Sequence, residues 1–488
     1  MLFNSIHFLL FLPIVVIVFY CLPAKVRYLW LLAASYYFYA QWNPVYLLLI
    51  LGCTVVTYVS ALLIESRSRS KAVMAGTLII TLGALCYYKY TPMLLHLAET
   101  VLSWFRIDAS RLQTMDILLP VGISFFTLQS IGYVIDVWRG DTKAEYNFFR
   151  FALFVSFFPQ LVAGPIERSK NLLSQLYSVQ KLSYENIRRG LLLVGYGLFL
   201  KVVIADRAAM IVNTVFEGLS EYTGLYVAIA AFFFAIQIYC DFYGYSVIAK
   251  GSALMLGIRL MDNFNAPYFS QSIKEYWSRW HISLSTWFRD YLYIPLGGNR
   301  KGKRRTQLNR LIVFAVSGLW HGAALSYMAW GILNALFQTG EDICKWLGAK
   351  WFPNRVPDKN RFSSRLFATL RSFILFDLAW ILFRAGGIRP ALLAFRSMFS
   401  TFNPFIFFDG SVFTLGVDKN YMAILMVSIL ILAIVDIQKY KGIDVVDRFF
   451  AQSPAFRLIA ELSLVFGIAL FGCYGEMYDV QQFIYFQF

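Results

Sequence analysis

The chain has 488 residues, of which 59% are hydrophobic and 18% aromatic. A soluble domain is roughly 45–50% apolar, so this composition excludes an ordinary soluble protein. The formal net charge is +16, from 44 Lys and Arg against 28 Asp and Glu. In so apolar a chain, this excess indicates basic loops on the cytoplasmic side of a membrane, and we expect no nucleic-acid partner.

Apolar runs near the length of a membrane span recur along the whole chain. A helix of about 20 residues crosses a hydrocarbon core of about 30 Å. A lipid-exposed backbone must satisfy its own hydrogen bonds, which favours helices. We predict an all-α polytopic membrane protein with about ten to twelve spans, the first retained as a helix. The runs are 3–22, 27–42 (ambiguous), 44–64, 72–90, 117–135, 147–165, 190–205, 225–249, 311–338, 366–385, 420–436 and 457–474.

The polar stretches between these runs are often basic. The sequence SRSRSK at 66–71 and the loop 166–189 are predicted to be cytoplasmic by the positive-inside rule. A stronger basic block consists of Arg300, Lys301, Lys303, Arg304 and Arg305. This block either only fixes the topology or also attracts an anionic ligand, and the residues alone leave both interpretations open.

Residues 262–310 are too polar to span a membrane, yet they are rich in aromatic residues. From Ser272 to Tyr293, apolar residues recur at helical spacing, which predicts one amphipathic helix with a single apolar stripe. Such a helix fits the membrane interface and equally the protein interior. Pro295 and the two glycines after it end the helix. The stripe consists of Trp277, Trp280, Leu284, Trp287, Phe288 and Tyr291.

The run 311–338 contains no Lys, Arg, Asp or Glu, and it has basic flanks at both ends. One straight helix would place one of these flanks outside the cell, against the positive-inside rule. We therefore predict a broken helix pair that enters and returns, with its break near Gly318–Gly322. Non-helical backbone at membrane depth persists only where protein buries it or water lines it, so we expect a cavity at His321.

His321 is the leading candidate for chemistry. An ionisable residue inside an apolar run indicates a functional site, and a neutral imidazole accepts or donates a proton near neutral pH. The structural alternative is a buried histidine that is hydrogen-bonded across helices. His281, in WSRWHIS, is a second and weaker candidate. Further candidates for lining a substrate path are Trp280, Trp320, Ser317, Asn265 and Arg289.

Asp241 lies inside the run 225–249. A carboxylate at that depth is costly and needs a partner. The sequence offers nearby hydroxyl groups that can solvate it, and Asp241 is either a structural hydrogen-bond hub or part of a substrate path. The hydroxyls are those of Tyr239, Tyr243, Tyr245 and Ser246.

Metal-binding and nucleotide-binding motifs are missing from the sequence. There is no HExxH, no CxxC and no Cys–His cluster, so we expect no metal and no bound cofactor. There is also no GxSxG, P-loop or GxGxxG, and two histidines without a recognisable nucleophile fit a general base. A transporter of glycans or lipids and a passive scaffold stay open as alternatives, although transporters often show two broken helices and only one is predicted here.

Several stretches resemble the membrane-bound O-acyltransferase (MBOAT) family. The most specific is YWSRWHISLSTWFRDYLYIPLGGNR at 276–300, followed by SGLWHGA at 317–323. Within the family, the sequence is most similar to the bacterial alginate O-acetyltransferase branch, from which Tyr243, Val247 and Lys250 depart. Supporting stretches are VGISFFTLQSIGYVIDVWRG at 121–140, FPQLVAGPIER at 158–168, YCDFYGYS at 239–246, NFNAPYFSQSIKEYW at 263–277 and the terminal FIYFQF.

The resemblance implies one integral-membrane domain over 1–488, in the bacterial cytoplasmic (inner) membrane. Its parts would be N-terminal helices at 1–261, a catalytic core segment at 262–340 and C-terminal helices at 341–488. About eleven helices would surround a central funnel, with interfacial and re-entrant helices beside them. His321 matches the family's histidine, and His281 matches its second polar position.

The resemblance also implies an acyl transfer. A cytoplasmic thioester, expected to be acetyl-CoA as co-substrate, would approach near Arg300 and Lys301. The acyl group would pass to an extracytoplasmic SGNH-type acetyltransferase partner or directly to a cell-envelope polysaccharide such as alginate, with membrane lipid around the protein. Alternatives are D-alanyl transfer from a carrier protein to teichoic acid, and a glycan or lipid transporter.

Overall fold

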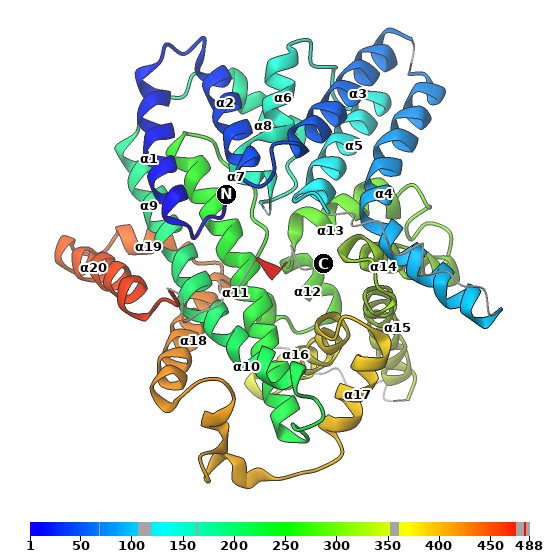
Figure 1. Cartoon of the computed structure of the whole chain (residues 1–488), viewed down its shortest axis with the longest axis vertical. Helices are drawn as coiled ribbons and strands as arrows, with labels where there is room; N and C mark the ends of the chain where they lie inside the picture. Colours follow the sequence, from blue (N-terminus) through cyan, green and yellow to red (C-terminus); the bar gives the residue numbers. More distant parts are fainter. Residues whose placement is uncertain (68, 106–118, 163, 352–360, 475–482, 485–488) are drawn as a thin grey trace. The chain divides into compact units, whose positions relative to one another are not determined.

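The computed structural model describes residues 1–67, 69–105, 119–162, 164–351, 361–474 and 483–484 (Figure 1). Within these ranges the chain is helical with short connections, and one isolated antiparallel bridge joins Phe264 to Trp280. The all-α prediction is confirmed. The last four residues of the FIYFQF stretch, 485–488, and the first two of the run 117–135 lie outside the described residues.

Six helices in the described part of the chain are long and apolar enough to cross a membrane. Each of them overlaps a predicted run, and α1 (Ile6–Cys21) is a shorter apolar helix. The polytopic architecture is therefore confirmed. The six helices are α3 (Tyr46–Ser66), α4 (Lys71–Trp104), α11 (Leu225–Met255), α16 (Phe362–Arg384), α18 (Lys419–Tyr440) and α20 (Pro454–Phe471).

The remaining predicted runs form shorter or divided helices, for local reasons. The run 147–165 is divided at Phe157, whose non-helical backbone separates α6 (Phe148–Ser156) from α7 (Phe158–Leu161). The run 190–205 passes from α9 (Tyr184–Leu198) into a π-helical stretch, Phe199–Ala205. The run 311–338 is also broken. Hydropathy over a window does not detect such breaks, so it overestimates the number of straight spanning helices.

The chain forms two compact units, Met1–Val194 with Ser246–Met261, and Gly195–Tyr245 with Asp262–Phe488. The prediction of one membrane domain over 1–488 stays a prediction. The first unit contains, besides α1, α3, α4, α6 and α7, the helices α2 (Arg27–Ala40), α5 (Ile123–Arg139) and α8 (Ser169–Tyr177).

In the first unit, two polar side chains hold the backbone that leads into residue 262. The Glu167 carboxylate accepts hydrogen bonds from the Met261 N–H at 2.6 Å and from the Asn171 amide at 2.6 Å. The Gln175 amide both donates to the Arg259 carbonyl and accepts from the Arg259 N–H. Burial raises the pKa of Glu167. These contacts hold the backbone of Arg259 and Met261, which lie outside any helix.

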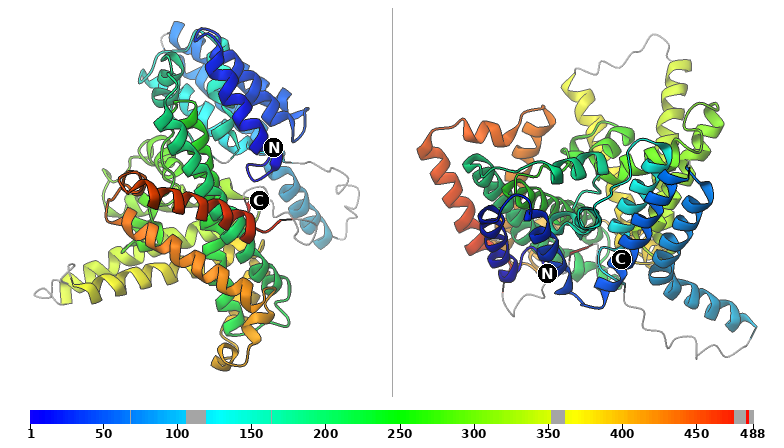
Figure 2. Two further views of the ribbon diagram at one scale, coloured as in Figure 1. Left: turned by 90° about the vertical axis from the view of Figure 1, so that its left-hand side faces the viewer. Right: turned by 90° about the horizontal axis from the view of Figure 1, so that it is seen from above.

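The second unit contains α10 (Asp206–Glu217), α12 (Ile273–Arg279), α13 (Ile282–Phe288), α14 (Lys303–His321), α15 (Leu325–Trp351), α17 (Ile388–Met398) and α19 (Val445–Phe450). Here α14 and α15 lie side by side, and α15 also packs against α16 (Figures 1 and 2). The short helix α12 packs against both α13 and α15.

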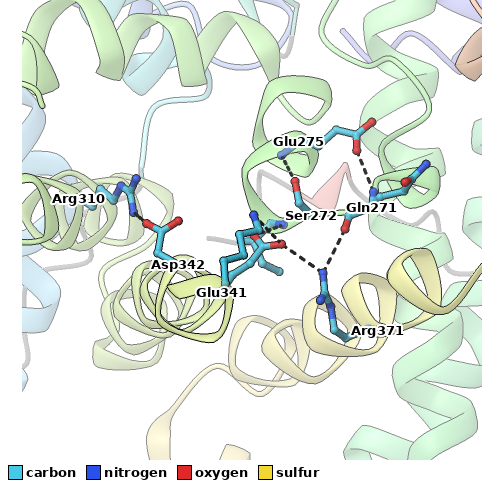
Figure 3. A network of polar contacts seen from close by, with 9 residues as sticks. Gln271, Ser272, Glu275, Arg310, Glu341, Asp342 and Arg371 are labelled. Carbon is cyan, nitrogen blue, oxygen red and sulfur yellow. Dashed lines mark hydrogen bonds and ion pairs between the residues drawn. The ribbon is translucent and has the colours of Figure 1, made fainter. Parts of the chain in front are cut away.

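A polar network fixes the start of α12 (Figure 3). The Ser272 hydroxyl accepts a hydrogen bond from the Glu275 N–H and so caps the helix. The Ile273 N–H donates to the Glu341 carboxylate of α15 at 3.2 Å. Arg371 of α16 pairs with the same carboxylate at 3.2 Å. Glu341 therefore joins three helices at one point.

Candidate functional site

His321 is the last residue of α14, and the chain breaks directly after it. Gly322 is extended, with φ −164° and ψ 160°, and α15 begins at Leu325. The Gln307 side chain of α14 accepts a hydrogen bond from the Thr339 hydroxyl of α15, so the two helices run antiparallel. The predicted broken pair is confirmed, with its break at the histidine.

Small residues let α14 and α15 approach closely. A Cβ atom at Gly318 would collide with the backbone carbonyl of Tyr327, and one at Gly331 would collide with the carbonyl of Phe314. The space between the helices thus has no room for side chains at these positions. As a result, the break holds His321 between the two helices, where its side chain is 4% exposed.

Aromatic rings surround His321. The centroid of its ring lies 4.9 Å from that of Trp320, 5.2 Å from that of Trp330 and 5.4 Å from that of Phe383. We call these three rings, from α14, α15 and α16, the aromatic cage. It confines the imidazole in a setting of low polarity, where its interaction with a reacting group is stronger than in water.

His281 lies at a second break, which corrects the predicted helix 272–293. α12 ends at Arg279, Trp280 is extended, and His281 takes left-handed angles of φ 44° and ψ 55° before α13 begins. The residues of the predicted stripe are nevertheless buried or half-buried. The periodicity identified the buried face correctly, but a contact from elsewhere in the chain interrupts the helix.

The structure brings the two histidines to the same tryptophan. The His281 ring lies 6.0 Å from Trp320 between centroids and 4.6 Å from Phe242 of α11. His281 is 1% exposed, and this burial lowers its pKa from 6.5 to about 3. It is therefore a neutral imidazole at neutral pH. Trp320 contacts both histidine rings, so the three side chains form one cluster.

Ser317 and Arg289 meet at a pocket of about 340 Å³. Ser317 lies one helical turn before His321 on α14, and so on the same face. Arg289 is 60% exposed and pairs with Asp290 at 2.8 Å. Both aromatic and basic side chains line this pocket. It is lined by Lys274, Trp277, Leu284, Ser285, Phe288, Arg289, Tyr293, Asn299, Arg310, Val313, Phe314, Ser317 and Gln338.

The other predicted residues lie in different settings. Trp280 is buried against Phe264 and Trp380, at 5.0 and 5.2 Å between ring centroids. The side chain of Asn265 is exposed, and its prediction as a residue lining a substrate path stays a prediction. Arg300 and Lys301 are exposed in the loop before α14 and follow Asn299, which lines the pocket. Their role in donor binding stays a prediction.

Asp241 has a partner that the sequence analysis did not propose. Its carboxylate pairs with the Lys201 ammonium at 2.7 Å, and Lys201 also pairs with Asp206 at 2.8 Å. The Ile484 N–H donates to Asp241 at 2.6 Å. Among the expected hydroxyls, Tyr239 donates instead to Asp436 at 2.7 Å. Asp241 therefore belongs to a buried ionic network. Lys201 is a charged residue inside the apolar run 190–205, and its position in the sequence could have identified it as a candidate partner for Asp241.

Asn263 and Ser283 were also missed. Asn263 is 3% exposed, and its side-chain oxygen accepts a hydrogen bond from the Ser283 hydroxyl at 2.6 Å. Nothing in the local pattern distinguishes this asparagine from Asn265. Predictions that no metal and no cofactor bind stay predictions.

Comparison with known proteins identifies the family of the chain. The sequence pattern of the membrane-bound O-acyltransferase family matches residues 143–370, which include both histidines. The chain is 39% identical to the probable alginate O-acetylase AlgI of Pseudomonas aeruginosa over 406 residues, covering 82% of this chain and 75% of that protein. It is 37% identical to the probable alginate O-acetylase AlgI of Azotobacter vinelandii, over 93% of this chain and 86% of that protein.

A third relative is named for a different activity. The chain is 33% identical to the peptidoglycan O-acetyltransferase of Helicobacter pylori over 434 residues, covering 82% of this chain and 80% of that protein. These matches extend well beyond the pattern of the two histidines. The chain is an acyltransferase and belongs to the membrane-bound O-acyltransferase family.

Proposed function

We propose that the chain moves an acetyl group from a cytoplasmic thioester, acetyl-CoA, to a cell-envelope polysaccharide. One observation carries this proposal. His321 is buried at a helix break inside the aromatic cage, one turn from the pocket that Ser317 lines. The names of the relatives, alginate O-acetylase and peptidoglycan O-acetyltransferase, support acetyl as the group and a polysaccharide as the final acceptor.

In this proposal His321 is the general base. It takes the proton of the acceptor hydroxyl while that oxygen bonds to the thioester carbonyl carbon. The carbon–sulfur bond then breaks, and the imidazolium returns the proton to the departing thiolate. A positioned general base contributes roughly 10²–10⁴-fold to such a step. The cage supports this role because it excludes water from the imidazole.

His281, which contacts the same tryptophan, assists the reaction in this proposal. Because burial lowers its pKa to about 3, His281 is neutral and carries one N–H at working pH. A neutral imidazole can donate a hydrogen bond to the carbonyl oxygen, where negative charge develops during attack. Removing one such donor from an enzyme typically reduces kcat by about 10²–10³-fold.

The pocket at Ser317 is where we place the acyl donor. Its aromatic wall suits the apolar arm of a thioester, and Lys274 and Arg310 at its edge suit phosphate groups. The exposed Arg300 and Lys301 in the nearby loop would raise the local concentration of an anionic donor. Acetyl-CoA is found in the cytoplasm, so the protein would lie in the bacterial inner membrane with this face inward.

Two molecules are candidates for the direct acceptor of the acetyl group. The acetyl group passes either to an extracytoplasmic SGNH-type partner, which then acetylates the polysaccharide, or directly to a sugar hydroxyl. D-alanyl transfer from a carrier protein is the second candidate donor reaction. Acetyl transfer and D-alanyl transfer both begin with the attack of a hydroxyl on a thioester. The chemical identity of the labelled product in an assay therefore distinguishes them.

The test is transfer of radiolabelled acetyl from acetyl-CoA in proteoliposomes, with the membrane fraction of the source cell as acceptor. Wild type should transfer label, and His321→Ala should insert normally but lose transfer by about 10²–10⁴-fold. His96→Ala is the matched control, because the side chain of His96 is 84% exposed. Wild-type transfer by His321→Ala would overturn the proposal. Activity only with a carrier-protein thioester would replace acetyl-CoA as donor.

A further inference from the structure

The break at His281 is held by a second piece of chain. The Asn263 carbonyl accepts a hydrogen bond from the Ile282 N–H at 2.9 Å, directly after the histidine. The Asn265 N–H donates to the Arg279 carbonyl at 3.0 Å, two residues before it. Phe264 and Trp280 form the antiparallel bridge between these bonds. We call Asn263–Asn265 the clamp, because it pairs with the backbone on both sides of the break.

The Asn263 side chain adds to the clamp. Its oxygen accepts hydrogen bonds from the Ser283 N–H at 3.3 Å and the Ser283 hydroxyl at 2.6 Å. The first N–H groups of a helix have no partner within the helix and need one from outside. At the start of α13, Asn263 supplies partners for two of them, through its carbonyl and its side chain. Asn263 and Ser283 are both buried, so water does not substitute for these bonds.

The conformation of His281 shows why such a clamp is needed. Its φ of 44° is in the left-handed region, which is unfavourable for any residue with a Cβ atom. Residues persist there only where the surrounding structure imposes it. The local sequence opposes the break, since the apolar stripe favours one continuous helix through Trp280 and Leu284. Relaxation to that helix would turn the imidazole away from Trp320.

We propose that Asn263 is a positioning residue that acts through Ser283 and the backbone of Ile282 to hold His281 against Trp320. The inference rests on the proposed function, which gives His281 its part in acyl transfer. It differs from the sequence-based expectation, which selected Asn265. Asn265 contributes only backbone bonds to the clamp, and its side chain is exposed.

The first experiment compares kinetics of full-length variants in proteoliposomes. Asn263→Ala should reduce kcat by about 10²-fold, because small misplacements of a reacting group have effects of this size. The KM for the donor should change little, because Asn263 does not line the pocket. Asn263→Asp keeps the accepting oxygen and should recover most of kcat. A larger kcat loss in Asn265→Ala than in Asn263→Ala would overturn the assignment.

A milder variant, Ser283→Ala, tests the clamp if Asn263→Ala does not insert into the membrane. It removes the 2.6 Å bond and leaves the Asn263 backbone in place. It should lower kcat in the same direction by a smaller factor. Ser278→Ala is the matched control, since Ser278 lies five residues earlier in the chain and is exposed. Equal activities of the Ser283 and Ser278 variants would contradict the clamp.

A spectroscopic measurement separates positioning from general stability. In protein labelled with ¹⁵N-histidine, the His281 ring signal should not titrate between pH 5 and 8 in wild type, since burial keeps its pKa at about 3. In Asn263→Ala that signal should begin to titrate, while the His321 signal stays as in wild type. An unchanged His281 titration together with wild-type kcat would overturn the proposal.

The two proposals fail in different ways. If His281→Ala transfers at the wild-type rate, the role of His281 in the proposed function is wrong, yet the altered His281 titration in Asn263→Ala would still demonstrate the clamp. If His281→Ala is inactive and Asn263→Ala is fully active with an unchanged titration, the clamp is wrong and the proposed function stands.

Discussion

The two histidine breaks are built in opposite ways. At His321, the break falls at Gly322, which is extended without strain, and glycines on both helices let the helices approach closely. At His281, the residue in the unfavourable conformation is the histidine itself, and the clamp imposes the break from outside. The first break is thus encoded locally and the second by a distant contact. A local break tolerates no added volume, whereas an imposed break tolerates no loss of its external bonds.

The largest effect is expected from added volume at the local break. Gly318→Leu should abolish transfer and lower the free energy of unfolding by about 1–3 kcal/mol or more, because its side chain would collide with the Tyr327 carbonyl. Gly340→Leu on α15 is the control, since a Cβ there has nothing within 4 Å. Thermal unfolding in detergent measures the stability of the two variants, and the transfer assay measures their activity. Equal melting temperatures for the two variants would mean that α14 and α15 are not closely packed.

The pH dependence of stability tests the burial of His281. Its pKa is about 3 in the folded protein and 6.5 when exposed, so the unfolded chain binds the extra proton between these values. Stability therefore falls as pH decreases below about 6.5, by up to ~1.4 kcal/mol per pH unit. Between pH 7 and 5, wild type should lose about 2 kcal/mol more than His281→Asn. Parallel losses in both proteins would contradict this burial.

Backbone strain at the imposed break is measured by a pair of variants. His281→Ala and His281→Gly both remove the imidazole, but glycine adopts a φ of 44° without penalty. The glycine variant should be the more stable by about 1 kcal/mol. Melting temperatures of the two purified variants give the difference. A more stable alanine variant would indicate that the left-handed conformation does not persist once the ring is removed.

The smallest effect is expected from the exposed basic loop before α14. Exchange of both Arg300 and Lys301 for Glu should raise the KM for acetyl-CoA by a few-fold at low salt, with kcat unchanged, because in the proposed function these exposed residues only attract the donor. The difference should shrink at high salt, where surface charges are screened. A change that is insensitive to salt would instead indicate direct contact with the donor.

The same contrast explains how much of the molecule could be predicted from its sequence. Hydropathy located the six long apolar helices found among the described residues, and the charge-free run with basic flanks located the break at His321. These are local signals. The site around His281 could not be predicted in the same way, because Asn263 acts through tertiary contacts while Asn265, two residues away, is exposed.

Partners of buried charges were likewise only partly predictable. Hydropathy shows that Asp241 needs a partner, but the choice of Lys201 depends on how α11 packs against the π-helical stretch. The tyrosines nearest in sequence bond elsewhere, as Tyr239 does with Asp436. An ionisable residue within a predicted span is therefore best paired with another such residue. Proximity in sequence is a poorer guide.

The Lys201 network has a consequence for how the protein is made. Lys201 and Asp206 lie in one continuous stretch and can neutralise each other as that stretch leaves the ribosome. Asp241 is synthesised later, on another helix, and a charge alone in lipid is costly. We therefore expect stable insertion of α11 to depend on the pairing of Asp241 with Lys201. The order of synthesis, with the cation first, matches the order in which the charges must be accommodated.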